Sequence, residues 1–148
     1  MSNRATVPSD EVRTHSVLVY SDNAATRERI ELAVGRRPAP DLGVVEFVHA
    51  NTHDGVIRAA DKALAEVFIL DGEAWPSGGM GICRQIKEEI RKKQPAVLLI
   101  IGRRDDAWLA KWSGAEAVVA HPIDPVEMAD ALSRLLRDRA GLPATAGS

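Results

Sequence analysis

The sequence predicts a single α/β domain in which helices cover both faces of a parallel five-stranded sheet. Three observations lead to this fold class. The chain has 148 residues, the length of one domain. Aromatic residues make up 4% of it, so the core must come from Ala, Val, Ile and Leu. Short continuous apolar runs alternate with segments of helical periodicity, a pattern typical of parallel strands buried on both faces.

Five such runs predict the strands. The first is short and β-branched, and the fourth is the most apolar of the chain. The third ends directly on Asp71, and a loop containing Gly and Pro follows it as far as residue 79. The expected strands span residues 17–20, 44–48, 67–70, 96–101 and 117–120.

Helical segments follow each strand. Their apolar residues recur every three or four positions, which places these residues on one face. Polar caps such as Asn23 precede the first helix, Pro38 stops it, and Pro95 ends the third. Asp124 followed by Pro125 is a strong start signal for the last. The expected helices span residues 24–37, 52–65, 81–93 and 105–113, and a final one begins at 125.

Composition excludes several function classes. The net charge of −2 argues against direct DNA binding or an acidic membrane surface as the main partner. The single cysteine, Cys83, excludes a disulfide framework and a cysteine-cluster metal site, and it fits a reducing compartment. No run of about 18 apolar residues predicts a transmembrane segment. We therefore expect a cytoplasmic domain over residues 15–139, with an N-terminal extension at 1–14 and a C-terminal tail at 140–148.

Right-handed crossovers between five parallel strands favour the flavodoxin-like order 2-1-3-4-5. The first and third strands are then neighbours at the switch point, where ligands bind beyond the carboxyl ends of the strands. Asp22 and Asp71 follow these two strands, and two carboxylates there can share Mg²⁺. The alternative is a helix cap for Asp22 and an ordinary loop carboxylate for Asp71.

In this arrangement the chain resembles the receiver domain of bacterial two-component response regulators. Residues 17–23 (VLVYSDN) resemble the family's first strand and acidic pair, and 68–71 (FILD) resemble the strand that carries the phospho-accepting aspartate. Pro76 and Gly81 resemble the Pro and Gly that follow that aspartate. Residues 120–124 (AHPID) resemble the end of the last strand, where the family has Lys-Pro.

The resemblance implies that Asp71 is the candidate phospho-acceptor. It also implies that Asp22 and Asp71 are candidate ligands of Mg²⁺, which would be needed only if Asp71 is phosphorylated; no other cofactor is required. The family's Lys-Pro peptide is commonly cis, so His121–Pro122 is a candidate cis bond.

Four positions depart from the family pattern. Ser21 replaces the first acid of the acidic pair, and Gly102 replaces the hydroxyl residue after the fourth strand. His121 replaces the lysine, and Val118 replaces the switch aromatic of the last strand. The loop from Asp71 to the following proline is also one residue longer than usual. We therefore expect the usual switch to be lost.

Tryptophans and arginines form the candidate interface. Trp108 and Trp112 lie one turn apart on the short fourth helix, and Trp75 lies in the loop after Asp71. Tryptophan is enriched at protein interfaces, although one of the two helical residues can equally serve the core. Arg103 and Arg104 either supply the cationic charge that His121 lacks or form a solvated helix start.

These observations favour a non-enzymatic protein-interaction module that works without phosphorylation. Its partner would be a histidine kinase, a transcription factor or a large multi-subunit enzyme complex, through which it could lie at a membrane as a stable subunit. One alternative is a phospho-accepting receiver that uses Asp71. Another is a flavodoxin-type cofactor binder, for which residues 21–26 would have to form a phosphate loop, and they supply none convincingly.

Overall fold

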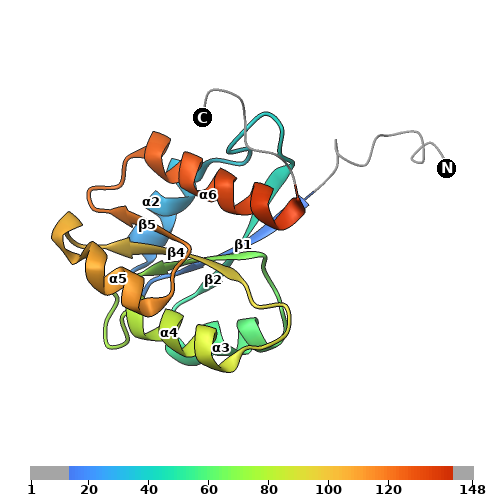
Figure 1. Ribbon diagram of the computed structural model, residues 1–148. Helices are drawn as coiled ribbons and strands as arrows, with labels where there is room; N and C mark the ends of the chain where they lie inside the picture. Colours follow the sequence, from blue (N-terminus) through green and yellow to red (C-terminus); the bar gives the residue numbers. More distant parts are fainter. Residues whose placement is uncertain (1–13, 142–148) are drawn as a thin grey trace.

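The computed structural model describes residues 14–141 and contains one parallel sheet in the order β2-β1-β3-β4-β5 (Figure 1). The predicted fold class and strand order are therefore confirmed. The strands are β1 (Thr14–Tyr20), β2 (Val44–Ala50), β3 (Val67–Asp71), β4 (Ala96–Ile101) and β5 (Ala117–Ala120). The helices are α2 (Ala24–Val34), α3 (His53–Asp61), α4 (Gly79–Glu89), the 3-10 turn η2 (Arg104–Asp106), α5 (Ala107–Ser113) and α6 (Pro125–Ala140).

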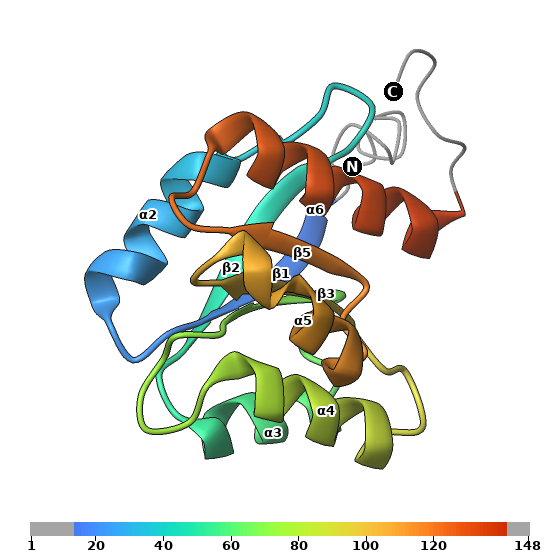
Figure 2. The same cartoon turned by 60° about the vertical axis from the view of Figure 1, so that its left-hand side comes forward.

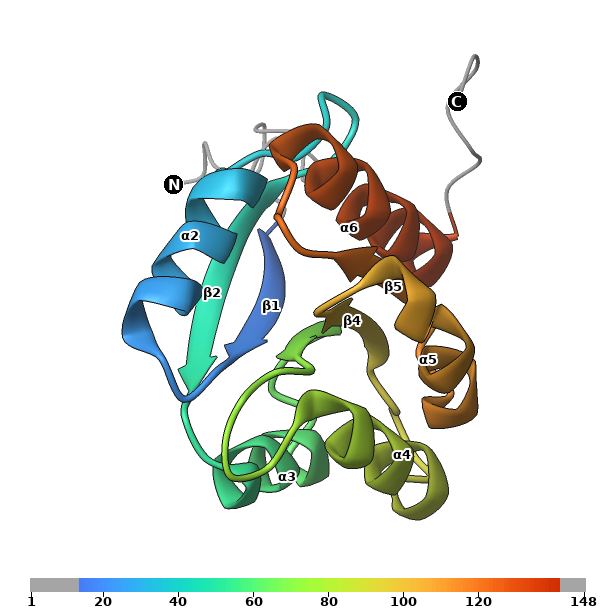
Figure 3. The ribbon, with the colours of Figure 1, turned by 90° about the vertical axis from the view of Figure 1, so that its left-hand side faces the viewer.

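The helices form two layers around the sheet. Helices α2 and α6 pack together on one face, and α3, α4 and α5 cover the other (Figures 2 and 3). Every residue of β3 and β4 is buried, as expected for central strands with helices on both sides. The predicted three-layer arrangement thus follows from continuous apolar strands that must be covered twice.

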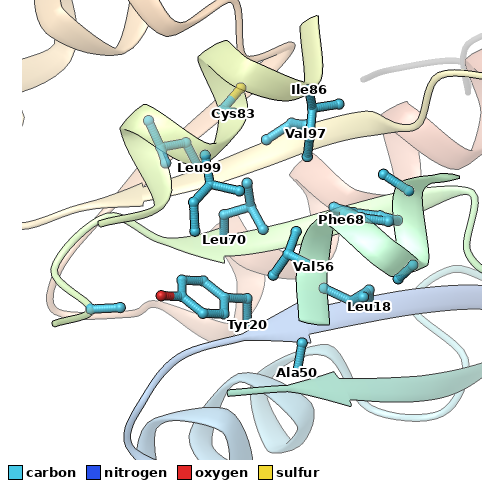
Figure 4. Packing of buried hydrophobic residues seen from close by; sticks show 14 of the residues in the cluster. Leu18, Tyr20, Ala50, Val56, Phe68, Leu70, Cys83, Ile86, Val97 and Leu99 are labelled. Carbon is cyan, nitrogen blue, oxygen red and sulfur yellow. The ribbon is translucent and has the colours of Figure 1, made fainter. Parts of the chain in front are cut away.

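Each face of the sheet has its own apolar core. Val17 and Val19 of β1 point into the core beneath α2 and α6. Leu18 and Tyr20 point to the opposite side, where they join Phe68 and the residues of α3 and α4 (Figure 4). This alternation is the ordinary consequence of successive side chains leaving a strand on opposite faces.

Local signals placed some element ends correctly. Strands β4 and β5 have the expected bounds, and α6 begins at Pro125 with the Asp124 side chain accepting a hydrogen bond from the Val126 N–H. Helix α2 ends at Val34, three residues earlier than expected, because the backbone at Gly35 adopts a φ of +74°.

Other ends depend on tertiary contacts. Strand β1 begins at Thr14, three residues early, because its polar start pairs with the edge strand β2, Thr14 opposite Val44. Helix α3 ends at Asp61, and Ala63 then adopts a positive φ, so Leu64 lies outside the helix and is exposed rather than on its buried face. Helix α4 runs from Gly79 to Glu89 instead of over residues 81–93.

The described residues begin in a strand and end at a helix cap. Thr14 already belongs to β1, Ala140 is the last residue of α6, and Gly141 caps that helix. The rest of the expected extension and tail lies outside the described residues. None of the helices within residues 14–141 has the length and apolar character needed to cross a membrane.

Candidate functional site

The candidate site lies at the carboxyl ends of β1 and β3. These strands are parallel neighbours, with Tyr20 opposite Leu70, so the residues that follow them meet at the same edge of the sheet. The edge brings together Ser21 and Asp22 from the first strand and Asp71 from the third. This is the meeting of side chains that the predicted strand order requires.

Asp71 is held by groups of its own chain. Its side chain is buried, with 5% of the residue exposed. The Ser21 hydroxyl donates to Oδ2 of Asp71 at 2.8 Å, and the Glu73 N–H donates to Oδ1 at 2.9 Å. The Asn23 N–H in turn donates to Oγ of Ser21 at 3.1 Å. Both oxygens of the carboxylate therefore already accept hydrogen bonds from neutral donors.

Asp22 is exposed at the rim of the site, where its Oδ1 accepts a hydrogen bond from the Trp75 N–H at 3.1 Å. Tyr20 lies below, with its ring in the apolar core and its hydroxyl donating to the Ser77 carbonyl (Figure 4). Burial and the nearby charges of Asp22 and Asp71 raise the pKa of Tyr20. The tyrosine hydroxyl thus stays protonated beside the two carboxylates.

Gly102 follows β4 at the same edge, and the side chain of Glu73 lies directly against it. A Cβ atom on Gly102 would be 2.9 Å from the carboxyl carbon of Glu73 and 2.9 and 3.0 Å from its two oxygens. Sequence reasoning missed Glu73, because nothing local indicates that a loop glutamate reaches from the end of one strand to the end of another.

His121 follows β5, and its N–H donates to the Ile101 carbonyl at 2.9 Å. The His121–Pro122 peptide is cis, which confirms the expectation, and Trp75–Pro76 is cis as well. The His121 side chain lines a groove of about 460 Å³ together with Leu32 and other residues of α2 and the β5–α6 loop. Val118 is half-buried and packs against the core beneath α4.

Metal binding stays a prediction. Within residues 14–141, no three His, Cys, Asp or Glu side chains form a group suited to a metal ion. Asp22 and Asp71 supply two carboxylates, and the third position belongs to the hydroxyl of Ser21, which is already bonded to Asp71. The donor set is thus poorer in charge than a Mg²⁺ ion prefers.

The three tryptophans are exposed: Trp75 by 76%, Trp108 by 70% and Trp112 by 53%. The sequence left open whether one of the two tryptophans of α5 packs in the core. In the structure both lie at the surface. The guanidinium of Arg84 stacks on the Trp112 ring at 4.8 Å and donates to the Trp112 carbonyl at 2.7 Å. The sequence offered no signal for Arg84, which comes from the neighbouring helix α4.

The two predicted arginines pair with surface acids. Arg103 lies 3.5 Å from Asp106, and Arg104 lies 4.0 Å from Glu127. Both arginine side chains are about three-quarters exposed, at 75% and 78%. These two carboxylates therefore partly neutralise the charges of Arg103 and Arg104.

Sequence comparison decides the family. No protein-family model matches the chain. Two proteins named as uncharacterized response regulatory proteins of Mycobacterium tuberculosis, from strains CDC 1551 and H37Rv, are each 49% identical to it over 121 residues. The alignment covers 82% of this chain and 90% of each relative. The chain belongs to the response-regulator receiver family.

Solved structures agree on the fold of this receiver. The receiver domain of a LuxO repressor protein from Vibrio parahaemolyticus superposes with a TM-score of 0.71 at 17% identity, covering 86% of this chain and 94% of that one. The chemotaxis regulator CheY4 of Vibrio cholerae gives 0.69 at 18% identity, covering 83% and 99%. At these identities the likeness concerns the fold alone.

Placed in this family, the site combines a retained aspartate with altered surroundings. Asp71 occupies the end of β3 and Asp22 the end of β1, as the family resemblance implied. By that resemblance, Ser21, Gly102 and His121 take the places of the family's acid, hydroxyl and lysine. This edge of the sheet thus holds two carboxylates and, at the other three positions, a hydroxyl, a glycine and an imidazole.

Proposed function

We propose that this receiver is a phosphorylation-independent protein-interaction module. The observation that carries the proposal is the state of Asp71, whose two carboxylate oxygens are bonded within the chain to Ser21 and Glu73. A switch needs a group that changes partners when the phosphoryl group arrives. Gly102 has no hydroxyl for this purpose, and Val118 is no aromatic ring.

The energies support the same conclusion. A hydrogen bond to a charged group contributes about 1.5 to 3 kcal/mol. Without the lysine and the hydroxyl, a phosphorylated state would lose roughly 2 to 5 kcal/mol of stabilisation. Conformational switches depend on gaps of a few kcal/mol, so a loss of this size is enough to abolish the response.

The exposed tryptophans supply the contact surface of the proposal. Trp108 and Trp112 lie on α5, beside the last strand of the sheet (Figure 2). Large aromatic side chains give most of the binding energy at protein interfaces when a partner covers them. The partner would be a histidine kinase, a transcription factor or a large multi-subunit enzyme complex, which could place the receiver at a membrane. The module needs neither catalysis, a cofactor nor nucleic acid for this task.

An affinity capture experiment tests the proposal. Wild type and Asp71→Asn are used side by side on native-host extract, including solubilised membranes, and retained proteins are identified by mass spectrometry. We expect a stoichiometric partner that both variants hold equally, because asparagine keeps the shape of the side chain and cannot accept a phosphoryl group. A partner gained or lost with Asp71→Asn would instead support a phospho-accepting receiver.

Two further variants locate the contact surface. Trp108→Ala removes an exposed aromatic ring from α5 and is expected to weaken capture at least about tenfold, the effect of a central interface residue. Leu32→Ala removes an exposed apolar side chain from α2 and serves as the matched control. Equal capture by both variants would place the interface elsewhere.

A further inference from the structure

The side chain of Glu73 spans two strand ends of the receiver. Its backbone N–H donates to Asp71 at the end of β3, at 2.9 Å. Its carboxylate lies against Gly102 after the end of β4, where a Cβ would meet both oxygens at 2.9 and 3.0 Å. One residue thus contacts both the acceptor carboxylate and the position from which the family's hydroxyl is missing.

Two glycines make this placement possible. The Gly72 N–H donates to the Ile100 carbonyl at 2.7 Å, and a Cβ on Gly72 would lie only 2.5 Å from that oxygen. This close approach holds the start of the loop against β4 and directs the Glu73 side chain towards the carboxyl end of β4. Gly102 has no side chain, so the carboxylate occupies the space that a side chain would need.

We propose that Glu73 is the residue that determines what this site accepts, and that its carboxylate keeps a phosphoryl group out. The inference rests on the proposed function and gives it a cause. A phosphoryl group on Asp71 would bring about two negative charges to the same edge of the sheet that carries Glu73 and Asp22. Like charges gathered at one edge of a sheet disfavour one another unless a cation lies between them.

Within residues 14–141, no cationic side chain forms an ion pair with Asp71 or Glu73, although Arg27 lies at this edge and donates to the Ser21 carbonyl at 2.6 Å. Arg103 and Arg104 pair with Asp106 and Glu127 at the surface. His121 stands in place of the family's lysine. Glu73 therefore acts by both charge and volume, and two substitutions separate these effects: Glu73→Gln removes the charge and keeps the size, whereas Glu73→Ala removes both.

Acetyl phosphate with Mg²⁺ is the probe. A carboxylate oxygen of Asp71 attacks the phosphorus atom, the bond to the acetate oxygen breaks, and acetate leaves; intact mass then reports the added phosphoryl group. We expect slow labelling of wild type, labelling of Glu73→Ala that is at least about tenfold faster, and an intermediate rate for Glu73→Gln. Glu28→Ala, which removes an exposed glutamate from α2, should behave as wild type. Adding Asp71→Asn should abolish every signal.

If none of the single variants is labelled, the effect of Glu73→Ala is measured again in a second parent protein. His121→Lys restores a cation, and the comparison is then His121→Lys with and without Glu73→Ala. Gly102→Ala is an independent check, because its Cβ displaces the flexible carboxylate of Glu73 without adding a hydroxyl and should raise labelling in the same direction.

The outcomes separate the two proposals. If Glu73→Ala labels no better than its parent in both backgrounds, the inference about Glu73 is overturned, while partner capture by wild type and Asp71→Asn still decides the proposed function. If wild type labels as fast as Glu73→Ala, Glu73 is no barrier. If in addition capture then depends on Asp71, the proposed function fails as well.

Discussion

Two buried serines allow the hydrogen bond at Asp71 to be measured as a difference. Ser21 is fully buried, donates to the Asp71 carboxylate at 2.8 Å and accepts from the Asn23 N–H at 3.1 Å. Ser133 of α6 is also buried, with 2% exposed, and among the described residues its hydroxyl has no hydrogen-bond partner. Alanine at each position makes the same chemical change in opposite surroundings.

The expected effects have opposite signs. Ser21→Ala removes one bond to a charged group, about 1.5 to 3 kcal/mol, and one neutral bond, about 0.5 to 1.5 kcal/mol. We expect its free energy of unfolding to fall by about 2 to 4 kcal/mol and its Tm by about 5 to 15 °C. Ser133→Ala removes a buried unsatisfied hydroxyl from a helix, so we expect a gain of up to about 2 kcal/mol.

Urea unfolding followed by circular dichroism measures both values. A double-mutant cycle of Ser21→Ala with Asp71→Ala then isolates the bond between these two side chains, and we expect a coupling of about 1 to 3 kcal/mol. Equal losses for the two serine variants, or a coupling near zero, would refute the view that Ser21 holds the buried carboxylate in place.

Three further predictions concern the rest of the domain. Burial raises the pKa of Cys83 to about 11, so about one thiol in a thousand is ionised at pH 8. We expect Ellman's reagent to react with Cys83 only when the protein unfolds. Fast reaction of the native protein would contradict this expectation. Arg137 donates two hydrogen bonds to Asp41 and holds the pKa of that carboxyl below its usual 3.8. The ion pair therefore stabilises the fold fully above about pH 4, and this stabilisation is lost as the pH falls through the lower pKa of the folded state. Asp41→Asn should therefore lower the free energy of unfolding by about 1 kcal/mol at pH 7, discounted for the half-exposed carboxylate, with the difference from wild type shrinking below about pH 4; a difference that grows with acid would exclude this explanation. Phe68→Ala creates a cavity at a fully buried position of the central strand β3. We expect it to lower the free energy of unfolding in urea by about 3 to 5 kcal/mol. A loss below about 1 kcal/mol would show that the core closes around the cavity.

Local chemistry explains where sequence reasoning succeeded. The run Ala96–Ile101 is apolar at every position, so only a strand covered on both faces suits it, and its bounds were predicted correctly. Asp124 and Pro125 carry a start signal that needs no distant contact. By contrast, Thr14 and His15 are polar, and their place in β1 depends on pairing with Val44 and Val45 of β2, which no local pattern reveals.

The same division applies to the candidate site. Asp22 and Asp71 were predicted as neighbours because each lies at or just beyond the end of an expected strand, and strand order then brings them to one edge. The bond between Ser21 and Asp71 joins residues 50 positions apart, and it depends on how each side chain is turned once the strands have paired. The exposure of Trp108 and Trp112 was left open for a related reason, since a helix this short has no clear apolar stripe.

The alternation of apolar strands and amphipathic helices by itself determined the fold, the strand order and the edge of the sheet where Asp71 lies. These follow from burial and chain connectivity, which are written into residue types and their spacing. Only the tertiary structure decided that the Glu73 carboxylate lies against Gly102. That contact joins two loops from different strand ends, and it exists because a glycine in one leaves room for a side chain of the other.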